Sequence, residues 1–234
     1  MKLYLVRHAQ AGDIKTNYDV LSENGIYQAK QLGKYFKKNK LTFDLYVCGT
    51  LNRQKETLSL IKKELQENKN EIILDSLDEI SEDLFKSLLQ YYIKKDKFLN
   101  YLFLELQKSK YSEKSKEIYI LILKNIFKNW ILDKENPVSF FNFKNHVLKI
   151  YDFLNENYNK HNIKNIIMVS SGTPIAILLG NVFHLEDSEA LNWMKKIYNT
   201  SLFIFNIKKK KFIYLEPISI NFCPHLLIHE QTLL

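Results

Sequence analysis

The sequence predicts an α/β fold in which a parallel sheet carries helices on its faces. Short apolar segments typical of buried strands stand at residues 2–6, 43–48 and 71–77. Amphipathic helical patterns lie between them, one beginning at Ser22 and one over residues 51–67. Alternation of this kind is typical of parallel sheets. With 234 residues, 46% of them hydrophobic, the chain is long enough to bury a large core without disulfides or metals.

The first helix has a clear start and one apolar face. Ser22 can cap the helix, and Glu23 places a negative charge in its first turn, where it interacts favourably with the helix dipole. The apolar positions recur at helical spacing, which places them on one side. They are Ile26, Ala29, Leu32, Gly33 and Phe36.

The second half of the chain resumes the alternation. Residues 139–160 are expected to form one helix, and residues 165–170 (NIIMVS) a buried strand. Gly172 stands at the turn that follows this strand. Residues 201–207 and 211–219 then predict a β-hairpin, since two apolar segments flank a short run of lysines.

Residues 82–135 interrupt the pattern of strands. This segment is dense in Leu, Phe, Tyr, Ile and Lys and contains neither Gly nor Pro. It predicts two or three helices. We therefore expect one domain over residues 1–234, with a helical cap inserted at about residues 82–135.

Composition narrows the class of protein. The net charge of +8 would suit nucleic acid or a membrane surface, but basic residues are interleaved with acidic ones throughout. We predict neither a nucleic-acid nor a membrane partner, and no segment approaches the ~18 apolar residues of a membrane span. With only Cys48 and Cys223, a disulfide framework is excluded. Together with Arg7, which precedes any signal-peptide core, this favours the cytoplasm.

Arginine usage marks two positions. Of 34 basic residues only Arg7 and Arg53 are arginine. A guanidinium differs from a lysine ammonium in its planar fork, which binds an oxyanion through two parallel hydrogen bonds. These two residues are therefore candidates for an anion site, and structural ion pairs are the alternative.

His8 follows Arg7 at the end of the first predicted strand. Ligands of parallel sheets bind where strands end at their carboxyl edge. A neutral imidazole there can attack phosphorus as a nucleophile, and an adjacent arginine can neutralise the phosphate. The pair thus indicates phosphoryl chemistry.

The context of this pair resembles a known family. Residues 3–12 (LYLVRHAQAG) and 21–33 (LSENGIYQAKQLG) resemble the histidine phosphatase superfamily, which includes phosphoglycerate mutases and histidine acid phosphatases. Residues 47–61, 76–80 and 168–176 are similar to three further segments of that family. Only the inserted helices lack diagnostic residues.

This resemblance implies a three-layer α/β/α sandwich with a mostly parallel sheet, phosphoglycerate mutase-like, and a cationic pocket at the strand ends. His8 would form a phosphohistidine without metal or cofactor, while Arg7 and Arg53 hold the phosphoryl group. Glu79 would protonate the leaving alcohol and then activate water. If the loop is shifted, Glu82 or Asp83, the next acidic residues, would serve instead.

One position departs from the family pattern. The family's second active-site histidine falls on Ser171, between Ser170 and Gly172. The chain resembles a subgroup with serine there and an Asn…His-Leu tail, matched by Asn221 and His225 in residues 218–226.

The departure affects the expected substrate contacts. Ser171 can still donate a hydrogen bond, and with Gly172 it lies near a predicted helix N-terminus that favours anions. His225 is the candidate for a second imidazole, against the alternative of a packing residue. Gln10 could line the mouth of the pocket. The other histidines have spacings that suit no metal site: His146, His161, His184 and His229.

The function that this pattern favours is a metal-independent phosphomonoesterase acting on a small phosphorylated substrate. Because Ser171 stands where the family has a histidine, the alternative is a catalytically weak or inactive protein. Such a protein would bind a phospholigand or have a regulatory role. A phosphoglycerate-type mutase is a further alternative, since such an enzyme must shield its phosphoenzyme from water.

Overall fold

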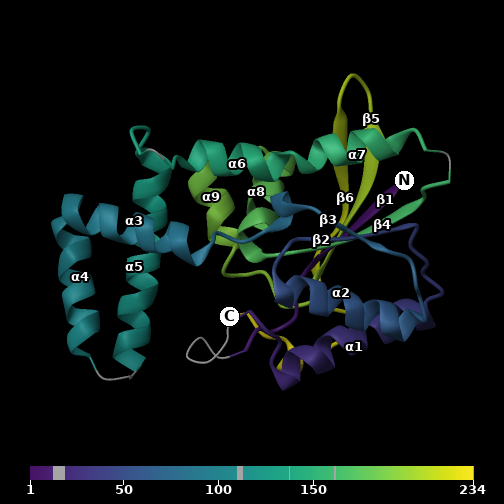
Figure 1. Cartoon of the computed structure of the whole chain (residues 1–234), viewed down its shortest axis with the longest axis horizontal. Helices are drawn as coiled ribbons and strands as arrows, with labels where there is room; N and C mark the ends of the chain where they lie inside the picture. The colour runs from purple at the N-terminus through teal and green to yellow at the C-terminus, as the bar shows by residue number, and fades with distance from the viewer. Residues whose placement is uncertain (13–18, 110–112, 137, 161, 234) are drawn as a thin grey trace. The chain divides into compact units, whose positions relative to one another are not determined.

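The computed structural model describes residues 1–234 except 13–18, 110–112, 137, 161 and 234 (Figure 1). The chain divides into two compact units. One comprises residues 1–79 and 146–234, and the other residues 80–145. Each unit is described by itself below.

A mostly parallel sheet forms the centre of the larger unit. Its six described strands lie in the order β3-β2-β4-β1-β5-β6. The first four of these are parallel, β5 is antiparallel to β1, and β6 is antiparallel to β5. The strands are β1 (Lys2–Arg7), β2 (Leu45–Cys48), β3 (Glu71–Ile73), β4 (Asn165–Ser170), β5 (Leu202–Lys209) and β6 (Ile213–Phe222).

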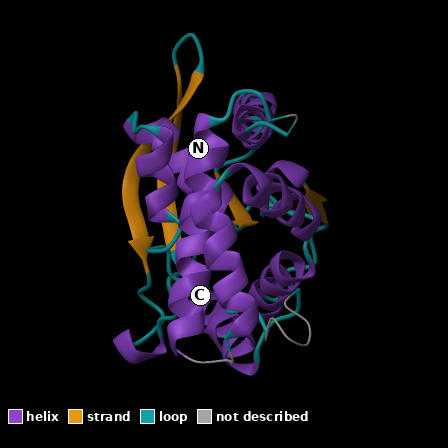
Figure 2. Ribbon diagram, turned by 90° about the vertical axis from the view of Figure 1, so that its left-hand side faces the viewer, coloured by secondary structure: helices purple, strands orange, loops and turns teal. Residues whose placement is uncertain are grey.

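Helices cover both faces of this sheet, which gives three layers (Figure 1). On one face α1 (Glu23–Lys38) and α2 (Asn52–Leu65) share a core with the sheet, in which Tyr4, Phe36 and Phe43 pack edge to face. On the other face lie α7 (Ile150–Tyr158) and α8 (Gly172–Phe183). The α/β/α architecture predicted from the sequence is confirmed. The β5–β6 hairpin, also predicted, extends beyond the other strands (Figure 2).

Capping explains where α1 begins. The Ser22 hydroxyl accepts a hydrogen bond from the amide of Gly25 at 3.0 Å, as its sequence position predicts. Ala29, Leu32 and Phe36 are buried on the inner face of α1. Lysines occupy its last turn, where their positive charge interacts favourably with the helix dipole.

Three elements differ from the sequence prediction: one helix is divided, one strand is shorter, and one helix was not expected. The helix expected over residues 139–160 is divided into α6 (Phe140–Leu148) and α7, because the Lys149 amide bonds the carbonyl of His146 in a tighter turn. The strand expected over 71–77 ends at Ile73, and Asp75–Leu77 forms the 3-10 helix η1. The unpredicted α9 (Asp187–Trp193) starts with a capping box between Glu186 and Glu189, and glutamate is not among the residues that usually mark a helix start. The other described short element is η2 (Ile228–Glu230).

The helical unit contains α3 (Glu82–Lys95), α4 (Lys97–Lys108) and α5 (Glu113–Leu132), within the two or three helices expected. Ser81 caps α3, and Asp96 caps α4 by accepting from the amides of Phe98 and Leu99. The centre of this unit is Trp130, whose indole is fully buried against Phe140 and whose Nε1 donates to the carbonyl of Val138.

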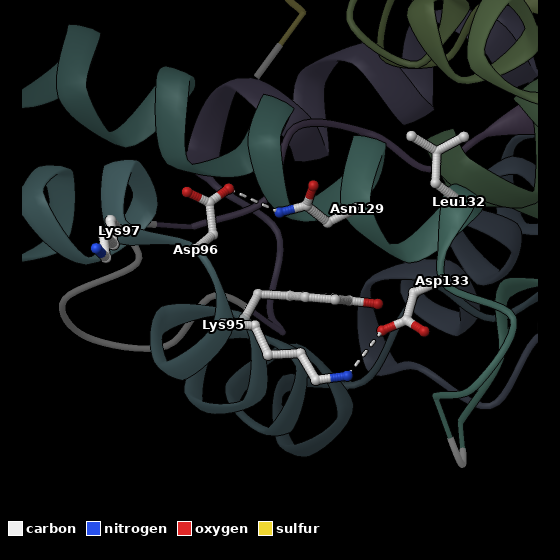
Figure 3. Close-up of a pocket in the computed structure, with 7 residues that line it drawn as sticks. Lys95, Asp96, Lys97, Asn129, Leu132 and Asp133 are labelled. Atoms are coloured by element: carbon white, nitrogen blue, oxygen red, sulfur yellow. Dashed lines mark hydrogen bonds and ion pairs between the residues drawn. The ribbon is translucent and has the colours of Figure 1, made fainter.

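A pocket of about 460 Å³ lies among these three helices (Figure 3). Two polar contacts cross it: the Asn129 amide donates to Asp96 at 3.1 Å, and the Lys95 ammonium lies 3.7 Å from the Asp133 carboxylate. Its polar lining therefore ties α5 to α3 and α4. The lining residues are Tyr92, Lys95, Asp96, Lys97, Asn129, Leu132 and Asp133.

None of the described helices is both long and apolar enough to cross a bilayer.

Gly25 permits a close approach between α1 and the segment after His8. A Cβ atom at this position would lie 2.1 Å from the backbone oxygen of Gln10. We expect Gly25→Ala to lower the free energy of unfolding by about 1–3 kcal/mol, although alanine favours a helix by ~1 kcal/mol over glycine. Urea unfolding measures this, with Lys34→Ala on the exposed side of α1 as the control. Equal or greater stability of Gly25→Ala would contradict the contact.

Candidate active site

The carboxyl ends of β1 and β4 bring the first candidate residues together. Arg7 is paired with Ser170 in the parallel register, and the amide of His8 donates to the Ser170 carbonyl at 2.8 Å. Arg7 and His8 are each only 3% exposed. The Arg7 guanidinium donates from Nη1 to the carbonyl of Ile197, which holds it at the strand end.

The imidazole of His8 has a defined tautomer. Its Nδ1 lies 2.8 Å from the Ala9 carbonyl, which can only accept, so Nδ1 carries the hydrogen. Arg53 Nε donates to Nε2 at 3.3 Å, so Nε2 presents a lone pair. Burial, followed by the charges of Arg7 and Arg53, holds the pKa of His8 well below its usual value of 6.5. The neutral imidazole is therefore the stable form at neutral pH.

Arg53 comes from the first turn of α2 and faces two groups. Its Nε contacts His8, and its Nη1 forms an ion pair with Asp19 at 2.9 Å. Asp19 also accepts from the amide of Asn52, which fixes the carboxylate at the start of α2. Thr57 ties this helix to the His8 segment, because its hydroxyl accepts from the Ala9 amide at 3.0 Å. Sequence reasoning missed Asp19, whose partner lies 34 positions away.

Ser171 and Glu79 meet at the N-terminus of α8. Ser171 is fully buried, and its hydroxyl accepts from Gln54 Nε2 at 2.8 Å. Glu79 Oε2 accepts from the amide of Thr173 at 3.1 Å. A Cβ atom on Gly172 would lie 3.8 Å from the same Glu79 oxygen. The residues predicted for the acid and for the family's second histidine position thus lie around one helix terminus.

The described side-chain contacts of Gln10 and His225 are not with His8, Arg7 or Arg53. Gln10 Oε1 accepts from the Ser22 hydroxyl and from the Asn24 amide, so it contacts the start of α1. The Thr200 hydroxyl donates to the Asn199 carbonyl and lies 2.8 Å from His225 Nε2, which donates to it. The predicted roles of these two residues in substrate binding stay predictions.

Two further predictions concern metals and thiols. Within the described part of the chain, no group of three or more His, Cys, Asp or Glu side chains is arranged to hold a metal ion, and His161 lies outside that part. Burial raises the pKa of Cys48 and of Cys223 to about 12, so both thiols stay protonated at neutral pH.

The layered fold, with a buried imidazole and two arginines at one sheet edge, defines a phosphoglycerate mutase-like α/β protein. The model of the Histidine phosphatase superfamily (branch 1) matches residues 3–119, which is half of the chain. The chain belongs to this superfamily.

Solved structures agree on the fold. A mycobacterial glucosyl-3-phosphoglycerate phosphatase in complex with inorganic phosphate matches with a TM-score of 0.62 and 14% identity, over 97% of this chain and 99% of that one. The alpha-ribazole phosphatase of Shigella flexneri matches with a TM-score of 0.60 and 19% identity, over 94% and 97%. A phosphoglycerate mutase of Bacillus anthracis matches with a TM-score of 0.60 and 15% identity, over 96% and 94%.

The burial of His225 has a consequence for stability. Burial lowers its pKa from 6.5 to about 4, against a smaller opposing effect of Glu230. The unfolded chain therefore takes up this proton before the folded chain does, and stability falls as the pH drops from about 6.5 to about 4. The loss attributable to this group is at most about 3 kcal/mol.

We expect His225→Gln to flatten that pH dependence, measured by urea unfolding between pH 7 and pH 4. His8 contributes in the same direction, so part of the slope will remain. His229→Gln, which changes an exposed imidazole, is the matched control. An unchanged slope in His225→Gln would mean that folding does not lower the pKa of His225.

Proposed function

We propose that this protein is a metal-independent phosphomonoesterase that acts on a small phosphorylated substrate through a phosphohistidine at His8. The observation that carries the proposal is the state of His8. The Nδ1 hydrogen bond to Ala9 leaves a lone pair on Nε2, which contacts Arg53 Nε, and the charge of the buried Arg7 also acts on the imidazole. This arrangement supports our assignment of the nucleophile to His8 and of oxyanion binding to the two arginines.

In the first step, His8 Nε2 attacks phosphorus and the bond from phosphorus to the ester oxygen breaks. Arg7 and Arg53 neutralise the charge on the phosphoryl oxygens, and Arg53 Nε exchanges its contact with the imidazole for one with the phosphoryl group. Glu79 in its acid form gives its proton to the leaving oxygen. The products of this step are the alcohol and a phosphohistidine.

In the second step, water attacks the phosphohistidine and the bond from phosphorus to Nε2 breaks. The Glu79 carboxylate takes one proton from that water, which restores the acid form for the next cycle. Inorganic phosphate leaves and the neutral imidazole is regenerated. The Thr173 amide, which donates to Glu79 Oε2, supports the orientation of this carboxylate.

The relatives support hydrolysis as the reaction. Two of the matched structures are of phosphatases, one of them with inorganic phosphate bound, and the third is of a mutase. The free thiols of Cys48 and Cys223 suit a reducing compartment, and we propose a cytoplasmic location. We propose neither a nucleic-acid nor a membrane partner.

Hydrolysis of an aryl phosphate in the presence of a metal chelator tests the proposal. We expect turnover that phosphate and orthovanadate inhibit competitively. The second candidate, a protein that binds a phospholigand without chemistry, is favoured by the serine at position 171 and by the Asp19 carboxylate on Arg53. It predicts phosphate binding by calorimetry with no turnover of any phosphomonoester.

A further inference from the structure

Ser171 stands at the N-cap of α8 but does not cap it. A serine at this position normally accepts a hydrogen bond from the second or third amide of the helix. Here the Ser171 side chain makes no such bond, although its backbone is extended as in an ordinary N-cap. Glu79 accepts from Thr173, the second helical residue, and Pro174, the third, has no amide hydrogen. The Ser171 hydroxyl is therefore released from capping.

Gln54 fixes this hydroxyl instead. Gln54 is fully buried, and its Nε2 donates to Ser171 Oγ and to the Leu77 carbonyl, each at 2.8 Å. Both amide hydrogens are thereby used, and Ser171 Oγ acts as an acceptor toward Gln54. The hydroxyl forms no other hydrogen bond within the described residues, so its own hydrogen is available to a bound ligand.

The amide oxygen of Gln54 argues against a purely structural role for this residue. Gln54 Oε1 is buried and has no hydrogen-bond partner in the part of the chain that the structure describes. A buried polar atom without a partner is unfavourable, and an apolar side chain of equal size would avoid it. The absence of a side chain at Gly49 makes room, since a Cβ atom there would lie 2.0 Å from this oxygen.

Both residues adjoin the groups that contact His8. Gln54 directly follows Arg53, whose Nε contacts the imidazole, and Ser171 directly follows Ser170, whose carbonyl accepts from the His8 amide. These two connections along the chain place Gln54 and Ser171 next to residues that contact His8, which supports a ligand shared by His8, Arg53 and Ser171.

We infer that Gln54 is a positioning residue: it orients the Ser171 hydroxyl as a hydrogen-bond donor to the phosphoryl group being transferred. The inference rests on the proposed function. It also explains how a serine serves at the position where the family pattern has an imidazole. Gln54 and Ser171 then form one unit, in which neither residue is effective without the other.

A double-mutant cycle tests this unit, with Gln54→Met, which keeps the volume but removes the donor, and Ser171→Ala. For aryl phosphate hydrolysis we expect each single variant to lower kcat by roughly 10- to 100-fold, with a much smaller change in KM. We expect the double variant to be no slower than the singles, because both changes remove the same interaction. Affinity for orthovanadate should fall in parallel.

Asn157→Leu provides a matched control, since it replaces a buried amide in α7. It should lower the melting temperature while kcat stays within about twofold, the behaviour of a structural site. Gln54→Met with a lowered melting temperature and unchanged kcat would overturn the inference. A kcat of the double variant that falls by the product of the two single losses would also overturn the inference.

The same experiment separates the two proposals. If the wild type has turnover that depends on His8, but the effects of Gln54→Met and Ser171→Ala multiply in the double variant, the role of Gln54 is rejected. The proposed phosphatase activity then still stands. If the wild type has no turnover, the proposed function fails, and orthovanadate binding by calorimetry decides the inference. Equal, non-additive weakening by the two substitutions would then support the pair, and unchanged binding would reject it.

Discussion

Replacing His8 with alanine is expected to abolish aryl phosphate hydrolysis, with a loss on the order of 10⁶ in kcat, which is typical of a missing nucleophile. The physical reason is the defined state of the imidazole. Its Nδ1 hydrogen is held by the Ala9 carbonyl, and its Nε2 lone pair faces a guanidinium rather than a proton donor that could protonate it at neutral pH. No arrangement of arginines alone forms the covalent intermediate.

The measurement compares turnover of the wild type and of His8→Ala without added metal. His146→Ala is the control, because that imidazole pairs with Asp75 at the surface of the same unit. Phosphate binding by His8→Ala should persist, since Arg7 and Arg53 are unchanged. Turnover at the wild-type rate in His8→Ala would refute the phosphohistidine mechanism.

Arg53→Lys is expected to lower kcat/KM by about 10²- to 10³-fold although the charge is kept. Arg53 uses two nitrogen atoms in different directions, Nε toward His8 and Nη1 toward Asp19. A lysine offers one nitrogen, which the Asp19 carboxylate would compete for. The variant would thus lose the donor beside His8 Nε2.

The kinetic constants of Arg53→Lys and of Lys62→Arg check this. Lys62 lies in the same helix and pairs with Glu71, so its replacement tests the exchange of side chains away from His8. Lys62→Arg should behave as the wild type. If Arg53→Lys does so too, the planar fork has no part in phosphate binding, and a simple positive charge suffices.

Much of the fold could be predicted because its signals are local. Strand 165–170 is a continuous apolar segment that the sheet buries on both faces, and Ser22 caps α1 as its position indicates. The division between α6 and α7 could not be predicted, since the change of hydrogen bonding at Lys149 has no glycine or proline to mark it.

The candidate site was predicted in part. The scarcity of arginine marked Arg7 and Arg53, and both guanidinium groups are buried in the structure. Asp19 and Gln54 were missed because their partners, Arg53 and Ser171, are brought to them only by tertiary packing. A polar residue that follows a candidate arginine has no pattern by which sequence reasoning could single it out. The roles of all these residues stay predictions until the variants are measured.

The most direct test of the central claim is to trap the phosphoenzyme. The wild type is mixed with an aryl phosphate, quenched in alkali within the first turnovers, digested and analysed by mass spectrometry. The account predicts one phosphoryl group on the peptide that contains His8, stable in alkali, lost in acid and absent from His8→Ala. A phosphoryl group on another residue, or steady turnover with none on this peptide, would contradict it.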